Sequence, residues 1–282
     1  MKIMWIKSLF ISGYLSLAFV TLAWAGYQAL QTSSPALLLL SLTALPICAF
    51  MGWLFLGNVP RTSANIPQLT LPTIVVSVAA AYQGVAEALP IVPVVAALLV
   101  VGVLLYVFWY SRFGDRSQSE LKLGEKLPQF ELQYPDGTTF HSNDSQGQAG
   151  LFIFYRGNWC PLCMAQIKEV AAQYQQLEQR GVKTYLISSQ SHANSEDLAK
   201  RFAVSFNFMV DVDNAAAKAL KIDAVGGTPA GLQGLGYDSD TVMPTVLMTD
   251  AEGKIIFLDQ TDNYRVRPEP ETFLQILDGK LA

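Results

Sequence analysis

The chain has 282 residues, of which 51% are hydrophobic and 15% are charged, and its formal net charge is −4. This length fits one or two domains, and the hydrophobic fraction favours a membrane component over an ordinary soluble protein. The mildly acidic balance, without basic runs, gives no support for nucleic-acid binding, which depends on phosphate neutralisation, so we expect no nucleic-acid partner.

Charged side chains are distributed very unevenly along the chain. Only four precede residue 111: Lys2, Lys7, Arg61 and Glu87. All the remaining Lys, Arg, Asp and Glu residues follow. The sequence therefore predicts an all-α transmembrane region over residues 1–110, a polar linker over 111–120 and a soluble domain over 121–282.

The apolar part divides into segments that are expected to form four helices, at about residues 5–30, 36–57, 71–88 and 91–110. The second and the fourth are long enough to cross a hydrocarbon core of about 30 Å. Tyr82, Gln83 and Glu87 make the end of the third polar, which leaves both a crossing and a non-crossing segment open. Glu87 itself is interpreted as a carboxylate at headgroup level at a helix end.

The first segment has two interpretations. Lys2 and Lys7 precede an apolar stretch that ends in Ala-Trp-Ala at residues 23–25, a small-x-small pattern like that of a signal-peptide cleavage site. The length of the stretch and the further apolar segments behind it favour an uncleaved anchor.

The basic residues predict the orientation. If all four segments cross, every membrane-proximal Lys and Arg lies on the same side as the soluble domain, and the positive-inside rule makes that side the cytoplasm. We therefore expect an integral protein of a bacterial-type inner membrane with a cytoplasmic C-terminal domain. If one segment does not cross, the domain becomes external or periplasmic.

The soluble domain begins with strand and helix patterns in alternation. A hairpin is expected around the Pro-Asp-Gly at 135–137, because Asp-Gly supplies the positive φ of a tight turn. Residues 151–155 are apolar on both faces, as is typical of a central strand. A helix with apolar residues at spacings of three and four follows as far as Leu177, and Gly181 closes it.

The later elements continue this alternation. They are a strand over 182–188, a helix capped by Asn194, a short helix over 214–220, a hairpin of 241–249 and 254–258, and a closing helix over 270–277. Strand, helix and strand in succession imply a parallel pair with a right-handed crossover. The expected fold is α/β: a three-layer sandwich around a central mixed sheet, preceded by the all-α transmembrane region.

A Trp-Cys-Pro-Leu-Cys motif at residues 159–163 follows the expected central strand. Two cysteines three apart share one face of a helix's first turn, so their sulfurs can close and reopen a disulfide with little backbone movement. The exposed N–H groups at the helix N-terminus favour a thiolate at Cys160, and Arg156 adds positive charge nearby. Cys160 is therefore the expected attacking nucleophile and Cys163 the resolving thiol, and the supporting residues are Arg156, Trp159 and Pro161.

The domain resembles the thioredoxin-fold superfamily, specifically its redoxin and peroxiredoxin-like (AhpC/TSA-like) branch. The matching segments are residues 124–132, 155–163, 208–222 and 242–246. The resemblance spans about 120–282 and implies a thioredoxin-like sandwich. It also implies that the Met243–Pro244 peptide bond is cis and faces the dithiol. The redox-active Cys160–Cys163 disulfide would then carry out the reaction without a separate cofactor.

Three functions remain open. The first is a membrane-anchored thiol–disulfide oxidoreductase, whose partners would be a protein dithiol electron donor or a client disulfide protein. The second is a peroxiredoxin-like thiol peroxidase with an antioxidant role on small hydroperoxides. The third is a non-enzymatic metal-binding or scaffold module, although Cys160 and Cys163 supply only half a tetrahedral zinc set, and His141 and His192 are isolated.

The sequence departs from both related patterns. The strand before the cysteines lacks the acidic residue of thioredoxins. In typical peroxiredoxins a Thr stands three residues before the peroxidatic cysteine; here Cys160 replaces that Thr, and Cys163 takes the peroxidatic position. Arg265 and Arg267 could stabilise charge on a peroxide oxygen, but their pattern is more typical of surface charges.

The bilayer is the expected partner of the apolar segments. They contain one cysteine, Cys48, and no evident set of quinone or haem ligands. We therefore expect these helices to tether the soluble domain rather than to relay electrons.

Overall fold

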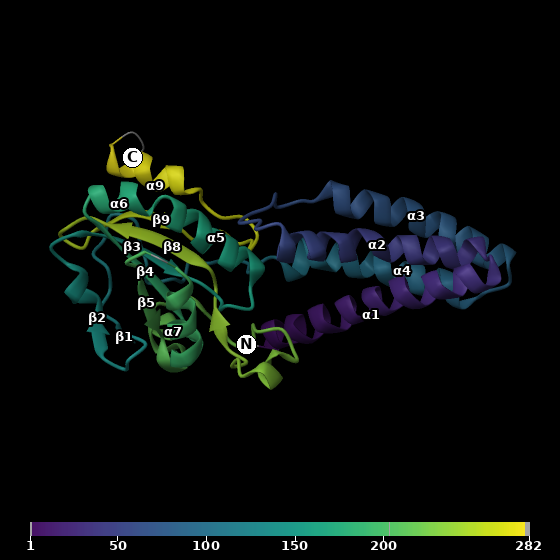
Figure 1. The fold of residues 1–282 in the computed structure, drawn as a ribbon, viewed down its shortest axis with the longest axis horizontal. Coiled ribbons are helices and arrows are strands. Elements are labelled where there is room, and N and C mark those ends of the chain that lie inside the picture. The colour runs from purple at the N-terminus through teal and green to yellow at the C-terminus, as the bar shows by residue number, and fades with distance from the viewer. Residues whose placement is uncertain (1, 203, 280–282) are drawn as a thin grey trace.

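The computed structural model describes residues 2–202 and 204–279. An elongated helical bundle projects from a globular α/β domain, and the N-terminus lies beside that domain (Figure 1). The last three residues of the predicted soluble domain, 280–282, lie outside the described residues.

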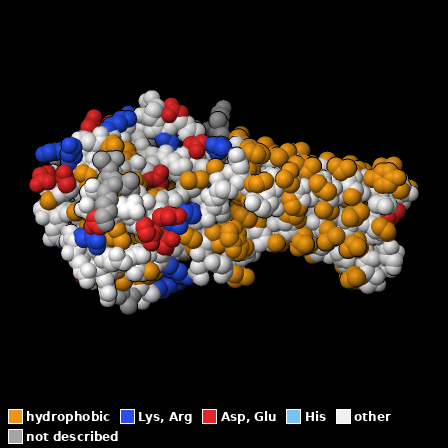
Figure 2. All heavy atoms as spheres, turned by 90° about the horizontal axis from the view of Figure 1, so that it is seen from above, with side chains coloured by type: hydrophobic (Ala, Val, Ile, Leu, Met, Phe, Trp, Pro, Cys, Tyr) orange, Lys and Arg blue, Asp and Glu red, His pale blue; other side chains and the backbone are white. Residues whose placement is uncertain are grey.

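The four apolar segments form the helices of the bundle. These are α1 (Lys2–Thr32), α2 (Pro35–Leu56), α3 (Pro67–Ala86) and α4 (Ile91–Leu105), and α4 continues into the π-helical turn η1 (Tyr106–Tyr110). All four are long and apolar enough to cross a membrane, with η1 counted as part of the last. Large apolar side chains such as Leu30, Val75 and Val78 are exposed on the bundle. Figure 2 shows hydrophobic side chains covering the bundle while charges gather on the domain.

Glu87 lies at the end of the bundle farther from the α/β domain, directly after α3. Its carboxylate accepts a hydrogen bond of 2.9 Å from the Ala36 backbone N–H and another from the Ser34 hydroxyl. A negative charge at a helix N-terminus is stabilising, so Glu87 caps α2 and ties two loops together.

The α/β domain is built on one mixed sheet. Its strands are β1 (Glu131–Gln133), β2 (Thr139–His141), β3 (Ala149–Phe154), β4 (Val182–Ser188), β5 (Asn207–Val210), β8 (Thr245–Thr249) and β9 (Ile255–Asp259). They lie in the order β2-β1-β5-β4-β3-β8-β9, in which β3, β4 and β5 are parallel and the other pairings are antiparallel. The helices are α5 (Pro161–Ala172), α6 (Tyr174–Gln179), α7 (His192–Arg201), α8 (Ala215–Ala219) and α9 (Pro270–Leu277).

The central strand β3 has apolar side chains on both faces, as its sequence indicates. Leu151 and Ile153 belong to one buried cluster together with residues of α5 and α9, whereas Phe152 and Phe154 belong to a second cluster with α8. The expected three-layer sandwich is confirmed.

Three elements differ in detail from the sequence-based expectation. The helix after the cysteines is interrupted at Gln173, which separates α5 from α6. Helix α7 is capped by Ser191, whose hydroxyl accepts from the Asn194 N–H at 3.2 Å, and not by Asn194. The expected strand 241–249 is broken at Pro244, which has no N–H to donate, so β7 (Thr241–Val242) pairs with β6 (Asp223–Ala224) in a separate sheet.

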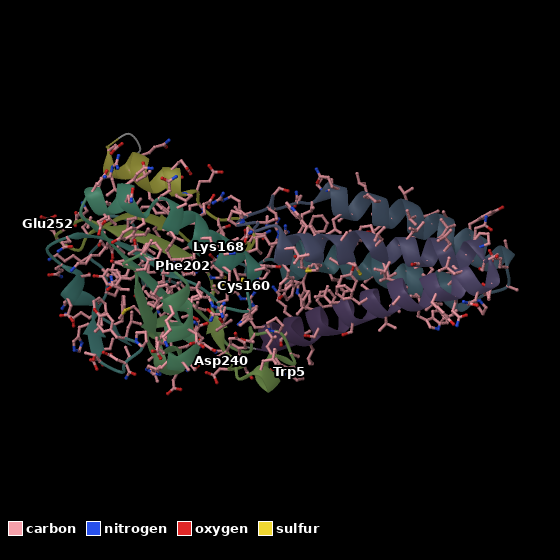
Figure 3. The ribbon with its side chains drawn as sticks, in the orientation of Figure 1. Trp5, Cys160, Lys168, Phe202, Asp240 and Glu252 are labelled. Carbon is pink, nitrogen blue, oxygen red and sulfur yellow. The ribbon has the colours of Figure 1, made fainter. Side chains whose placement is uncertain are left out.

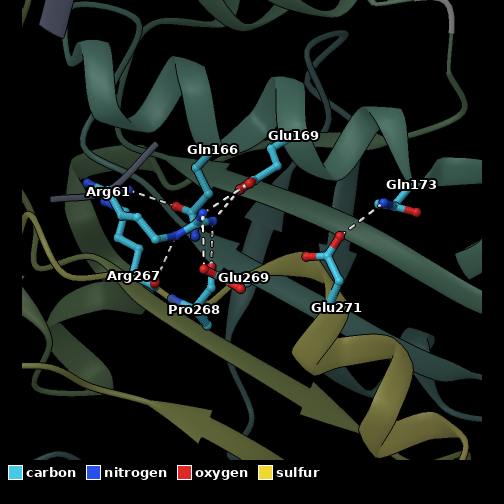
Figure 4. Close-up of polar contacts among 8 residues, drawn as sticks. All are labelled: Arg61, Gln166, Glu169, Gln173, Arg267, Pro268, Glu269 and Glu271. Carbon is cyan, nitrogen blue, oxygen red and sulfur yellow. Dashed lines mark hydrogen bonds and ion pairs between the residues drawn. The ribbon is translucent and has the colours of Figure 1, made fainter. Parts of the chain in front are cut away.

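The bundle and the domain are docked through polar contacts as well as apolar packing. Arg61, in the loop between α2 and α3, donates to Glu169 of α5 at 3.0 Å and to the Arg267 carbonyl at 3.1 Å, and lies 3.8 Å from Glu269 (Figure 4). The buried apolar cluster of the bundle also continues without interruption into the domain.

Arg265 fastens this interface from inside. Its side chain is fully buried and donates to loop 57–66 and to the end of the bundle, at distances of 2.8 to 3.0 Å: to Thr62 Oγ1, Ser63 O, Ala64 O and Ser111 Oγ. The sequence pattern suggested a surface charge here, and that interpretation is wrong. Four oxygen acceptors that converge within one loop and one helix end compensate its burial.

The Arg265→Met variant should therefore loosen the docking. Each hydrogen bond to a charged group contributes about 1.5–3 kcal/mol, so we expect the free energy of unfolding to fall by at least about 3 kcal/mol. Thermal unfolding of the detergent-solubilised chain and trypsin cleavage at Arg112 or Arg116 measure this. The control is Arg180→Met, which removes an ion pair with Asp278 at the surface and should change neither readout. Equal stability of the two variants would contradict the prediction.

Candidate active site

The two cysteines occupy the junction between β3 and α5. Gly157 has φ +136°, a conformation that favours glycine, and turns the chain so that Cys160 becomes the N-cap of α5 and Pro161 its first residue. Cys163 lies in the first turn, as the spacing predicted. Both are free thiols, and Cys160 is 2% and Cys163 0% exposed.

A buried arginine lies against both sulfurs. Arg267 Nη2 is 3.4 Å from Cys163 Sγ and 4.0 Å from Cys160 Sγ. Gln166 of α5 holds the guanidinium through a 2.7 Å bond from Arg267 Nη1, and the Tyr264 carbonyl accepts from Arg267 Nε at 3.1 Å. The Arg267 guanidinium thus contacts the two sulfurs, an amide oxygen and a backbone carbonyl, and its positive charge can compensate a thiolate. The sequence ranked Arg267 as a surface charge, which the structure corrects.

The electrostatics place the negative charge on the inner sulfur. Burial opposes ionisation of Cys163, but a hydrogen bond from Cys160 and the charge of Arg267 lower the pKa of Cys163 to about 5. Burial and the hydrogen bond to Cys163 raise the pKa of Cys160 well above its ordinary value. The pair thus shares one proton, and its ionisation belongs to both sulfurs together. The helix N-terminus alone had suggested a thiolate at Cys160.

Arg156 and Trp159, two of the expected supporting residues, lie against each other beside the dithiol. Arg156 is buried, its Cζ lies 4.6 Å from the Trp159 ring centroid and 5.5 Å from that of Tyr264, and one nitrogen donates to the Gly227 carbonyl. Its Nε has no hydrogen-bond partner among the residues that the structure describes. Arg156 and Trp159 therefore form a stacked wall beside the dithiol, as cation–π geometry allows.

Met243 and Pro244 do not match the expectation from the resemblance. The Met243–Pro244 peptide is trans. The Met243 N–H donates to the Ile222 carbonyl at 2.8 Å, and the Pro244 carbonyl accepts from Arg116 at 2.8 Å, so this backbone is occupied by contacts within the domain. Neither residue lines the cavity beside Cys160. The expected cis bond is wrong.

A cavity of about 450 Å³ opens beside Cys160, and its walls come from both parts of the protein. The bundle contributes residues of α1, α2 and η1, and the domain contributes the dithiol turn and loop 229–237. The lining residues used below are Leu15, Phe55, Tyr106, Tyr110, Arg156, Trp159, Leu235 and Tyr264. Figure 3 shows Cys160 at the boundary between domain and bundle. The helices therefore form part of the site in addition to anchoring it.

The histidines have neighbours of their own. His192 Nε2 lies 2.8 Å from Gln133 Oε1, and His141 Nδ1 lies 3.4 Å from Glu131. Neither of these two contacts involves Cys160 or Cys163.

Sequence reasoning considered Arg267 only as a possible peroxide-stabilising charge, less favoured than a surface charge, and it missed the tyrosines of the cavity. Tyr106 and Tyr264 join their hydroxyls at 2.9 Å across the interface, and Tyr110 packs edge-on against Tyr264 at 5.8 Å between ring centroids. The available signal was local: the segment Asn-Tyr-Arg-Val-Arg-Pro at 263–268 carries two arginines beside an aromatic residue, directly after the last strand of the sheet.

The α/β domain is similar in sequence to known proteins. Residues 123–258 match the model of the AhpC/TSA family, which confirms the redoxin resemblance of the α/β domain. The thiol–disulfide oxidoreductase ResA of Bacillus subtilis is 25% identical over 161 residues, covering 56% of this chain and 78% of ResA. ResA of Halalkalibacterium halodurans is 25% identical over 162 residues, covering 56% and 80%. Peroxidoxin BcpB of Mycobacterium tuberculosis superposes with a TM-score of 0.47 and 15% identity over 58% of this chain and 100% of that one.

Proposed function

We propose that this redoxin is a membrane-anchored thiol–disulfide oxidoreductase that works through the Cys160–Cys163 pair. The observation that carries the proposal is the contact of buried Arg267 with both sulfurs at the N-terminus of α5. A low thiolate pKa is what disulfide exchange requires of the pair. The similarity to ResA supports the same class of reaction.

The reaction follows from the positions of the sulfurs. Cys160 gives its proton to Cys163 or to solvent and attacks a substrate disulfide from the cavity, which forms a mixed disulfide and releases one substrate thiolate. Cys163 then attacks the Cys160 sulfur, closes the intramolecular disulfide and releases the second thiolate. Two electrons pass from the dithiol to the substrate, and the enzyme's two thiol protons end on the released thiols or in solvent. A reducing thiol partner returns the enzyme to the dithiol.

Exchange with a small disulfide tests this function. The reduced full chain, mixed with oxidised glutathione, should lose two alkylatable thiols in parallel and gain an internal disulfide detectable by mass spectrometry. If both cysteines stay alkylatable after prolonged incubation, the proposal fails.

Peroxide reduction is the second candidate, and one observation favours it. Cys163 occupies the peroxidatic position of the related family and has the lower pKa of the pair. Rapid mixing of the reduced chain with hydrogen peroxide distinguishes the two functions: fast sulfenate formation at Cys163 supports peroxidase activity, whereas oxidation at the rate of a free thiol excludes it.

We infer that the redoxin domain faces the cytoplasm. Helix α1 begins and α4 ends at the domain, and Arg61 binds the domain, so the basic residues of the membrane region gather at this end. Glu87 lies at the other end. A C-terminal reporter that is active only after export should be inactive in this fusion. Reporter activity would place the domain outside and overturn this orientation.

A further inference from the structure

The cavity beside Cys160 is the feature that the exchange reaction leaves unexplained. Cys160 lines it, while Cys163 does not, and the exposed fraction of Cys160 is only 2%. The pocket is therefore the space in the described structure that borders the outer sulfur of the pair. Its volume of about 450 Å³ suits a small organic molecule.

The mouth of the cavity is apolar and borders the membrane region. Phe55 at the end of α2 is 64% exposed, and Leu235 in loop 229–237 is 72% exposed. The same loop is fastened to α1, because Ser8 Oγ donates to the Thr228 carbonyl at 2.6 Å and Ser12 Oγ donates to the Ala230 carbonyl at 2.7 Å. Exposed apolar lining residues from both the bundle and the domain fit a ligand that arrives from the lipid phase.

The inner wall is aromatic and contains polar groups close to the sulfurs. Tyr106 and Tyr110 stack with their ring centroids 5.8 Å apart, and Trp159 and Tyr264 complete the wall. Arg156, which is 5% exposed, has an Nε that finds no hydrogen-bond partner within residues 2–202 and 204–279. A flat ring that carries a hydrogen-bond acceptor fits this combination, because aromatic faces bind the ring and a buried donor gains from an acceptor.

We propose that the cavity binds a lipid-soluble quinone that oxidises the dithiol, an inference that rests on the proposed exchange function. The ring lies against the aromatic wall, a carbonyl oxygen accepts from Arg156, and the isoprenoid tail leaves through the mouth between Phe55 and Leu235. Cys160 and Cys163 form a sulfur–sulfur bond and give up two electrons. The quinone takes those electrons and two protons, from the thiols or from solvent, and leaves as quinol.

A hydroperoxide fits the cavity less well than a quinone. The Thr hydroxyl that stands three residues before the peroxidatic cysteine in typical peroxiredoxins is replaced by Cys160. A hydroperoxide also makes no use of the aromatic wall. The membrane helices are then part of the reaction path, in contrast to the tether that their sequence suggested.

The test uses the reduced full chain in nanodiscs, mixed under anaerobic conditions with decylubiquinone. We expect one quinol per internal disulfide and saturation with quinone concentration. Leu15→Trp, which fills the cavity from α1, should slow quinone reduction at least tenfold. The matched control is Leu9→Trp on the same helix, where the side chain is 47% exposed and lies outside the cavity lining; it should react as the parent does.

A second measurement does not depend on the folding of a variant. An azido-quinone photolabel on the parent chain should mark peptides of α1, α2 or loop 229–237, and excess decylubiquinone should prevent the labelling. Exchange with oxidised glutathione, measured on the same preparation, separates the two proposals. Active exchange without quinol formation overturns the quinone site alone, whereas loss of both overturns the exchange function. Equal rates for the two Trp variants, or labelling elsewhere, also overturn the site.

Discussion

Replacing Cys160 with serine should abolish turnover, because Cys160 is the only cysteine among the described residues that line the cavity. Cys163 is completely buried behind it and keeps Arg267 at 3.4 Å, so its thiolate persists without access to a disulfide. We expect exchange with oxidised glutathione to fall to the level of the uncatalysed reaction. Alkylation after denaturation should still find Cys163 reduced.

The Cys163→Ser variant should behave differently from Cys160→Ser. Cys160 can still attack, but no second sulfur resolves the product, so one glutathione per chain remains attached to Cys160 and is detected as a mass increase. Attack should also be slower than in the parent, because the thiolate that accepts the Cys160 hydrogen bond is missing.

The third cysteine provides a matched control for both variants. Cys48 is buried in α2, does not line the cavity and is 7% exposed, so Cys48→Ser should leave exchange unchanged. Glutathione trapped on Cys163 in the Cys160→Ser variant would reverse the assigned roles. Rapid sulfenate formation at Cys163 in that variant would favour the peroxidase alternative.

The elements of the fold were accessible to sequence reasoning where a local pattern has one physical meaning. The run 151–155, apolar on both faces, predicted the central strand, which spans Ala149–Phe154, and the Asp-Gly turn joins β1 and β2 in the expected hairpin. The four apolar segments form helices because length and composition alone specify them. The Cys-x-x-Cys motif predicted the position of the candidate site, since both cysteines belong to a single helical turn.

What sequence reasoning could not give were contacts between distant segments. Arg265 and Arg267 are indistinguishable from surface charges until the chain folds, because their acceptors lie about 100 to 200 residues away in sequence. The cavity is similarly invisible, since α1, α2 and η1 each supply only part of its wall. Pro244 shows the opposite error. The resemblance implied a cis peptide bond facing the dithiol, whereas here the Pro244 carbonyl accepts a hydrogen bond from Arg116.

Replacing Arg267 with methionine should weaken the thiolate more than any other change outside the cysteines. A positive charge within 4–6 Å of an ionisable group shifts its pKa by about 1–3 units, so the pKa of Cys163 should rise by about that amount from about 5. At pH 6 the thiolate fraction, and with it the rate of exchange, should then fall about twofold for a rise of one unit and about tenfold for a rise of two. The pH dependence of the thiolate ultraviolet absorbance of the reduced chain measures the shift directly.

The direction of the pH effect on stability follows from the same shift. In the parent the folded pKa of Cys163 lies below that of a free thiol, so the reduced protein gains stability as pH rises above about 5, and the gain is complete above the ordinary thiol pKa. In Arg267→Met this gain should shrink and begin at higher pH. Arg267→Lys keeps a charge and should recover part of both effects, while Arg180→Met at the surface should alter neither. An unchanged titration in Arg267→Met would mean that the helix N-terminus and the Cys160 hydrogen bond stabilise the thiolate without the arginine.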